Sequence, residues 1–369
     1  MLKFNPLQSC VDLSFWSELT ERKLDKLKLS EEPIQITGFV SACRYSQIPS
    51  RVLVSDQSFI ASLQSSDGSE SVSGFNSEIG SESPTLRLGH SIPGTLLNTN
   101  SLDSFKNIDK TALLRKAAAE IVVDIASGAA EEDPSLLTRF VLLTHADLKK
   151  YIYYYWFCFP TIKVNPASLR SPPRRLSDAL DPILANKISL VCDAWRNSNT
   201  SSLSPSPSSS PPSSSLPASI LPLPPPSNSS PAPFWIVAVR FAPGSGSGSG
   251  SGDVDVAAYP LKDWRRLRLQ RCDLGSDLAV NSIPNPDPNL DPNTGHPTPL
   301  AKSTVTDFYV AFSDPSHLTD APAMSLRNFL TFAAATDFGG GGGAEGEGHE
   351  RAPLKVICVR DSKGFMDHG

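Results

Sequence analysis

The sequence lacks an apolar run of the length that a membrane span requires. Its densest apolar and aromatic stretch, Tyr151 to Pro160, is ten residues long, whereas a membrane-spanning helix needs about 20 residues. The first residues, MLKFNPLQSCVDLSF, also lack the continuous apolar segment of a signal peptide. We therefore expect a soluble, cytoplasmic protein without a membrane span.

Cysteine is scarce and widely spaced. The sequence has six cysteines and no C-x-x-C pair, a spacing that fits neither a zinc site nor a disulfide framework. We expect reduced thiols and no metal site. The cysteines are Cys10, Cys43, Cys158, Cys192, Cys272 and Cys358.

An excess of positive charge is also missing. The net charge is −5 and the pI is about 5.7, whereas nucleic-acid-binding proteins usually carry a basic surface. One basic segment, WRRLRLQR at 264–271, alternates with leucine. We interpret it as an exposed strand or helix face, and phosphate binding is the weaker alternative.

Common catalytic motifs are absent: the sequence has no H-E-x-x-H, G-x-S-x-G or P-loop pattern. The run Gly341, Gly343 and Gly346 matches G-x-G-x-x-G, but that motif holds a dinucleotide only where a strand precedes it and a helix follows. A helix-like segment precedes it here, so we expect no nucleotide site. His145 lies between predicted elements, and we expect it to be solvated or hydrogen-bonded at a strand end rather than catalytic. These patterns predict no catalytic residue and no cofactor.

Five low-complexity segments interrupt the chain. They are rich in Ser, Pro, Gly, Asn or Asp and have too few large apolar side chains to join a core. The segments are 61–91, 201–233, 242–252, 273–301 and 339–352. We expect one domain in two parts, 1–60 with 92–200 and then 234–366, with 61–91 a disordered insert and 201–233 a linker.

The segments between these inserts predict alternating helices and strands. Apolar residues recur at helical spacing over 12–28, 109–125 and 326–335, and short continuous apolar runs predict strands. Predicted strands cover 36–40, 139–144, 234–241 and 353–360. The predicted class is α/β or α+β, with mixed sheets flanked by helices.

The aromatic segment DLKKYIYYYWFCFP (147–160) has three interpretations. A membrane anchor is excluded by its length. A base-stacking platform requires interleaved basic residues, and none occurs between Lys150 and Lys163. A short aromatic run that ends at Pro160 is typical of a buried strand, which is the interpretation we favour.

Five segments in order resemble one protein family. PGTLLNTNSLDSFKNIDK (93–110) and the aromatic segment 147–160 are the strongest matches, supported by further segments at 11–29, 326–330 and 360–365. Together they resemble the N-terminal domain of autophagy-related protein 7, the activating enzyme for ubiquitin-like modifiers in autophagy.

The resemblance implies a domain that recruits the autophagy conjugating enzymes, autophagy-related proteins 3 and 10. It also implies a separate adenylation domain, which we expect to be absent from residues 1–369. That domain would bind ATP and the modifiers, autophagy-related proteins 8 and 12, carry the catalytic cysteine and mediate homodimerisation. The family's N-terminal Phe-Ala-Pro motif corresponds to Phe4, Asn5 and Pro6 here. We expect Phe4 and Pro6 to contact a partner.

Two alternatives stay open at this point. In the first alternative, the sequence is a truncated record of a complete activating enzyme. In the second, it is an unrelated non-catalytic cytosolic scaffold whose Pro-rich linker binds SH3-like partners. The linker contains PLPPP, but no basic residue flanks it, as such ligands usually require.

Overall fold

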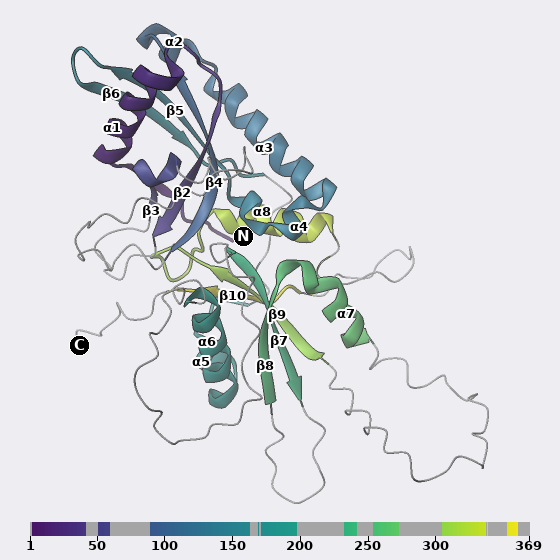
Figure 1. Cartoon of the computed structure of the whole chain (residues 1–369). Coiled ribbons are helices and arrows are strands. Elements are labelled where there is room, and N and C mark those ends of the chain that lie inside the picture. The colour runs from purple at the N-terminus through teal and green to yellow at the C-terminus, as the bar shows by residue number, and fades with distance from the viewer. Residues whose placement is uncertain are drawn as a thin grey trace, which may run out of the picture.

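The computed structural model contains two mixed β-sheets with helices packed on them (Figure 1), which confirms the predicted fold class. It describes residues 2–41, 51–59, 89–162, 169, 171–197, 232–241, 254–272, 305–336, 338 and 353–360. The predicted inserts fall almost entirely outside these residues. One boundary is wrong: residues 89–91, which we assigned to the first insert, begin a strand.

The first sheet has six strands in the order β1-β3-β2-β4-β5-β6. β1 is parallel to β3 and β4 is parallel to β5, whereas the other neighbours are antiparallel. The strands are β1 (Gln8–Val11), β2 (Ile34–Ser41), β3 (Arg51–Val54), β4 (Gly89–Thr99), β5 (Phe140–Asp147) and β6 (Ile152–Cys158).

Helix α1 (Leu13–Arg22) covers one face of this sheet. It begins where the side chain of Asp12 accepts a hydrogen bond from the backbone N–H of Ser14, the usual role of an N-cap. Its apolar side buries Phe15, Trp16 and Leu19 against the sheet, as the spacing predicted. Leu24, which the same spacing placed on this side, is instead 64% exposed. A short π-helix, η1 (Lys23–Leu27), continues it.

Helix α3 (Lys110–Ser127) lies on the opposite face with the short helix α2 (Leu102–Asn107) before it. Asp109 caps the N-terminus of α3, and Gly128 ends it with a left-handed φ of 82°, a conformation that glycine adopts without strain. Helix α4 (Ala129–Glu132) and the 3-10 helix η5 (Pro134–Thr138) lead into β5.

The aromatic strand is a correction to our prediction. The segment does form a strand, β6, but it is the edge of the sheet and is only partly buried. Tyr155 is 46% exposed, and Trp156 is half-buried. The strand that is buried on both faces is its neighbour β5, and β6 shields one side of it.

The second sheet has four strands in the order β10-β9-β7-β8. Helix α6 (Pro182–Asn197), which follows α5 (Leu176–Ala179), packs on one face of this sheet. Helices α7 (Trp264–Cys272) and α8 (Ser325–Ala335) pack on the other face. The 3-10 helix η7 (Leu261–Asp263) precedes α7. The strands are β7 (Phe234–Phe241), β8 (Val254–Pro260), β9 (Val305–Ser313) and β10 (Val356–Val359).

Asn328 connects the two sheets through α8. This asparagine is fully buried. Its amide nitrogen donates hydrogen bonds to the carbonyl oxygens of Leu137 at 2.8 Å and Pro160 at 3.0 Å. Its side-chain oxygen accepts one from the backbone N–H of Ile162 at 2.9 Å. The second half of the chain is therefore fastened to the segments before β5 and after β6.

Candidate partner-binding site at the N-terminal segment

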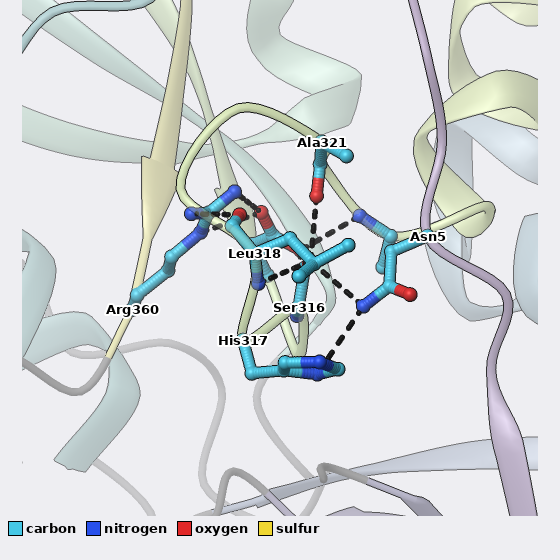
Figure 2. Close-up of polar contacts among 8 residues, drawn as sticks. Asn5, Ser316, His317, Leu318, Ala321 and Arg360 are labelled. Carbon is cyan, nitrogen blue, oxygen red and sulfur yellow. Dashed lines mark hydrogen bonds and ion pairs between the residues drawn. The ribbon is translucent and has the colours of Figure 1, made fainter. Parts of the chain in front are cut away.

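The N-terminal segment that carries Phe4 and Pro6 lies along the loop between β9 and α8 (Figure 2). The backbone N–H of Asn5 donates to the carbonyl of Pro322 at 2.8 Å, and the N–H of Met324 donates to the carbonyl of Asn5 at 2.9 Å. These bonds form an isolated parallel bridge between Asn5 and Ala323. The segment is thus held by its backbone, independently of which side chains flank the bridge.

The bridge places the two predicted contact residues differently. Phe4 is half-buried against the core under α8, and the guanidinium carbon of Arg327 lies 5.8 Å from the centre of its ring, within the range of a cation–π contact. Pro6 is exposed. Phe4 therefore has a structural contact on one side, while Pro6 points its ring to solvent.

The side chain of Asn5 adds contacts that the alanine of the family motif has no atoms to make. Its amide nitrogen donates to the hydroxyl of Ser316 at 3.0 Å and lies 3.4 Å from Nδ1 of His317. The Ser316 hydroxyl in turn donates to the carbonyl of Ala321 at 2.6 Å. It also accepts from the backbone N–H of Leu318 at 3.2 Å. The asparagine at this position therefore tightens the contact between the N-terminal segment and the loop.

Asp314 shapes the loop from inside. Its side chain is fully buried, and Oδ1 accepts hydrogen bonds from the backbone N–H groups of Ser316 at 3.0 Å and Ala323 at 2.9 Å. Oδ2 accepts from Nε of Arg360 at 2.9 Å. A buried carboxylate is stable only when paired and hydrogen-bonded in this way.

Arg360 brings the strand β10 to the same loop. It follows the last residue of β10, and besides its ion pair with Asp314 it donates from Nη1 to the carbonyl of Leu318 at 2.6 Å (Figure 2). Segments near both ends of the chain, around Asn5 and around Arg360, therefore meet on one loop. Neither Asp314 nor Arg360 was identified as a site residue from the sequence, although Arg360 begins the segment 360–365 that resembles the family.

Two described cysteines, Cys158 and Cys192, are buried, and Cys358 is partly buried. Burial raises the pKa of Cys158 to about 11. Burial, followed by the nearby carboxylate of Asp193, raises the pKa of Cys192 to about 12. Burial, followed by the carboxylate of Asp314, raises that of Cys358 to about 12. Since the thiolate is the nucleophile, a raised pKa disfavours the reactive form of each of these three thiols.

The other candidate groups are accounted for by ordinary contacts. His145 is buried, and its Nδ1 lies 3.2 Å from the carbonyl of Thr99, which confirms the hydrogen-bonded histidine that we predicted. Cys43 and the run Gly341 to Gly346 lie outside the residues that the structure describes. Among the described residues no group of three or more His, Cys, Asp or Glu is placed to hold a metal ion, and none of the described helices is long and apolar enough to span a membrane.

The basic segment 264–271 lies in α7, which buries Trp264 and Leu267 against the core and exposes Arg265 and Arg266. These two arginines and Lys262, just before the helix, are paired with acids. Arg265 bonds to Glu131 at 3.0 Å, Lys262 to Glu132 at 3.2 Å and Arg266 to Asp263 at 3.2 Å. These acidic partners neutralise the charge that a phosphate group would require. The interpretation as a solvated face is confirmed for the described part of α7.

Comparison with known proteins identifies curated relatives that align with less than half of the chain. The human ubiquitin-like modifier-activating enzyme ATG7 is 40% identical over 161 residues, which are 44% of this chain and 20% of the human protein. The Dictyostelium discoideum relative is 36% identical over 162 residues, 44% of this chain and 21% of that protein. The aligned part is thus about a fifth of the length of these curated relatives.

Solved structures of a yeast relative align over nearly the whole chain at low similarity. The Kluyveromyces marxianus Atg7 N-terminal domain aligns with 99% of this chain and 87% of its own at 17% identity and a TM-score of 0.45. The same domain in complex with Atg10 aligns with 98% of this chain and 84% of its own at 17% identity and a TM-score of 0.44.

The family comparison is the decisive one because of its extent. The sequence model described as the N-terminus of the ubiquitin-like modifier-activating enzyme ATG7 matches residues 2–368. That range contains both sheets, the loop 314–324 and the N-terminal segment bound to it. The chain belongs to the family of ATG7 N-terminal regions.

Proposed function

We propose that this chain recruits conjugating enzymes for an autophagy enzyme that activates ubiquitin-like modifiers. The observation that carries the proposal is the family match over residues 2–368. The partners in this proposal are autophagy-related proteins 3 and 10, as the family resemblance implies. The modifiers, autophagy-related proteins 8 and 12, and ATP would be bound by the whole enzyme outside residues 1–369.

Recruitment by a separate domain has a clear physical benefit. A conjugating enzyme held close to the activated modifier meets it at a high effective concentration, so that transfer becomes effectively intramolecular. The recruiting domain contributes no reacting group to this process. Its requirements are a stable scaffold and a surface held in a fixed position.

Within the proposal, Phe4 and Pro6 contact the partner. The support is their placement: the backbone bridge at Asn5 holds both residues in fixed positions, and Pro6 is exposed. A segment that is already ordered loses little conformational entropy on binding. Phe4 would present the face of its ring that the core does not cover.

The test is calorimetric titration of the purified chain with each conjugating enzyme. We expect saturable binding, together with background levels of modifier-dependent ATP–pyrophosphate exchange. Absence of binding at high micromolar concentration would overturn recruitment, and exchange above background would overturn the non-catalytic assignment.

The alternative of an unrelated scaffold is excluded by family membership. Binding of an SH3-like domain to the Pro-rich segment 201–233 is a separate question, because that segment lies outside the described residues. Deleting 201–233 and repeating the titration distinguishes the two surfaces. We expect conjugating-enzyme binding to persist.

A further inference from the structure

The loop between β9 and α8, residues 314–324, holds the N-terminal segment but has no helix or strand of its own apart from the bridge at Ala323. A loop of this kind keeps a fixed shape only where specific bonds hold it. Its outer turn, 317–320, is exposed. The shape of the loop, and with it the position of Phe4 and Pro6, therefore depends on the bonds made to the loop from inside.

Asp314 bonds directly to the residue that pairs with the N-terminal segment. Its Oδ1 accepts from the backbone N–H of Ala323 at 2.9 Å, and Ala323 is the bridge partner of Asn5. The next N–H, that of Met324, donates to the carbonyl of Asn5 at 2.9 Å. One carboxylate thus fixes the backbone on which the N-terminal segment lies, so the orientation of this carboxylate decides where the segment is held.

Arg360 sets the orientation of that carboxylate. Its guanidinium contacts Oδ2 of Asp314 through Nε at 2.9 Å and Nη2 at 2.8 Å, which leaves Oδ1 to the loop. The same guanidinium donates from Nη1 to the carbonyl of Leu318 at 2.6 Å, in the exposed turn (Figure 2). A planar guanidinium with donors in fixed directions holds two acceptors at once in this way. Arg360 therefore fixes the loop both at its first residue and at its outer turn.

The backbone that carries this arginine belongs to the second sheet. Arg360 directly follows β10, in which Val359 is the register partner of Ser313 in β9. The N–H of Asp314 donates to the carbonyl of Val359 at 3.0 Å, so the two chains are still joined where the loop begins. The sheet thus fixes an otherwise irregular loop through one side chain.

We propose that Arg360 is a positioning residue for partner binding. It holds the loop that fixes Phe4 and Pro6, and the affinity for the partner depends on it although it is not a contact residue. Among the described residues, no hydrogen bond or ion pair joins Arg360 to the segment 2–7. Because the arginine extends from β10, a displacement of this strand moves the partner-binding segment with it. The inference rests on the function proposed above for Phe4 and Pro6.

Hydrogen exchange of the whole 369-residue chain tests the structural step without a partner. The N–H of Asn5 is bonded to the carbonyl of Pro322 at 2.8 Å, and we expect it to be protected in the parent. Arg360→Met should accelerate exchange in the peptide that contains residues 2–7 about tenfold, since the loop loses the bonds that fix its shape. Unchanged exchange would overturn the proposal.

Arg139→Met is the matched control. Arg139 forms an ion pair of the same kind, with Asp124 at 2.6 Å, and the side chains of Arg139 and Arg360 are 22% and 26% exposed. Its bonds are to Asp124 and not to the loop 314–324 or to the segment 2–7. Both substitutions remove a comparable ion pair, so a general loss of stability affects both variants. We expect exchange and affinity at the parent's level in Arg139→Met, and equal changes in the two variants would contradict a specific role of Arg360.

Titration with autophagy-related protein 10 tests the functional step. Arg360→Met should bind about tenfold more weakly than the parent, because the partner must then order the segment itself. Arg360→Lys should lie between the two, since a lysine keeps the charge beside Asp314 but cannot also bond to Leu318. If Arg360→Met is unfolded at the assay temperature, Arg360→Lys takes its place, and it should still exceed the Arg139→Met control in both measurements.

The two measurements distinguish this inference from the proposed function. Faster exchange with parent-like affinity in the Arg360 variants would overturn the positioning role and leave recruitment intact. Absence of binding in the parent would overturn recruitment, and the positioning role in partner binding with it.

Discussion

The ring of Phe140 lies directly over the backbone of Gly94. A Cβ atom on Gly94 would lie 2.2 Å from Cζ of Phe140 and 2.3 Å from its Cε1, distances at which no side chain fits. The two residues are register partners in the parallel pair β4–β5, and Phe140 is buried. The glycine of the motif PGTLLN is therefore required by packing: it provides the space in which the aromatic ring lies.

This contact predicts a steric defect in Gly94→Ala. The added methyl group forces Phe140 to move within a packed core, and we expect the free energy of unfolding to fall by about 3 kcal/mol, the upper range for an overpacked core. Urea denaturation measures the loss. Gly38→Ala, where the nearest Phe140 atom is 2.8 Å away, should cost less.

A second substitution, at Phe140, distinguishes this steric clash from a general destabilisation of β4 by alanine at position 94. Phe140→Leu in the Gly94→Ala background removes the clashing ring, so the double variant should be more stable than the sum of the single losses predicts. Strictly additive losses would contradict the explanation.

Asn328 provides a prediction about how the two sheets are joined. Asn328→Leu removes the partner of three backbone groups, those of Leu137, Pro160 and Ile162. Each unsatisfied buried group costs about 1–3 kcal/mol, so we expect a loss of several kcal/mol in thermal or urea denaturation. Thr331→Val is the control on the same helix, because its hydroxyl bonds only within α8 to the carbonyl of Arg327. Equal stability of the two variants would show that Asn328 does not join the sheets.

The local elements of the fold were predictable because their signals lie close together in the sequence. Asp109 and Gly128 mark the two ends of α3, and the spacing of Ile121 and Ile125 places its buried side. Strand order was not predictable. The aromatic run of β6 has the composition of a buried strand. Whether a strand lies at the edge or the centre of a sheet depends on which strands pair with it, and a residue such as Tyr155 does not indicate its strand's partners.

The candidate site was predictable only in part for the same reason. The motif identified Phe4 and Pro6 as contact residues, and this remains a prediction. Their location next to Ser316 depends on a contact between residues 311 positions apart, which no local pattern encodes. Asp314 was missed because a single aspartate after an apolar strand has no distinctive spacing. Its role follows only from the geometry of its partners.

We predict that the burial of His90 makes the folded protein less stable in acid. This histidine is buried in β4, and burial, followed by the charge of Arg196, lowers its pKa from 6.5 to about 3. Between these values the unfolded chain binds a proton that the folded chain does not. The free energy of unfolding therefore falls as the pH drops below 6.5, by about 1.4 kcal/mol per pH unit from this group.

Comparison with His90→Gln isolates this contribution from other titrating groups. The variant has no imidazole to protonate, so its stability relative to the parent should rise by about 2 kcal/mol between pH 7 and pH 5. Urea denaturation at several pH values measures the difference. A difference that stays constant with pH would show that the folded protein protonates His90 without penalty.

Variants of the N-terminal segment distinguish the role of its backbone bridge from the role of its side chains. Asn5→Ala loses the bond to Ser316 but keeps both backbone bonds of the bridge, so affinity for the conjugating enzyme should stay within about threefold of the parent, the effect of one neutral hydrogen bond. Asn5→Pro removes the N–H that bonds to Pro322, which releases the segment, and we expect at least a tenfold loss, about 1.4 kcal/mol. Phe4→Ala should lose about as much if its ring is a contact residue. Calorimetric titration of the three variants distinguishes a structural role of the segment from a contact role of Phe4. If Asn5→Pro loses affinity and Phe4→Ala does not, the segment is a structural element, because the backbone bridge is then required and the ring is not. Parent-like affinity in all three would exclude the N-terminal segment from the binding surface.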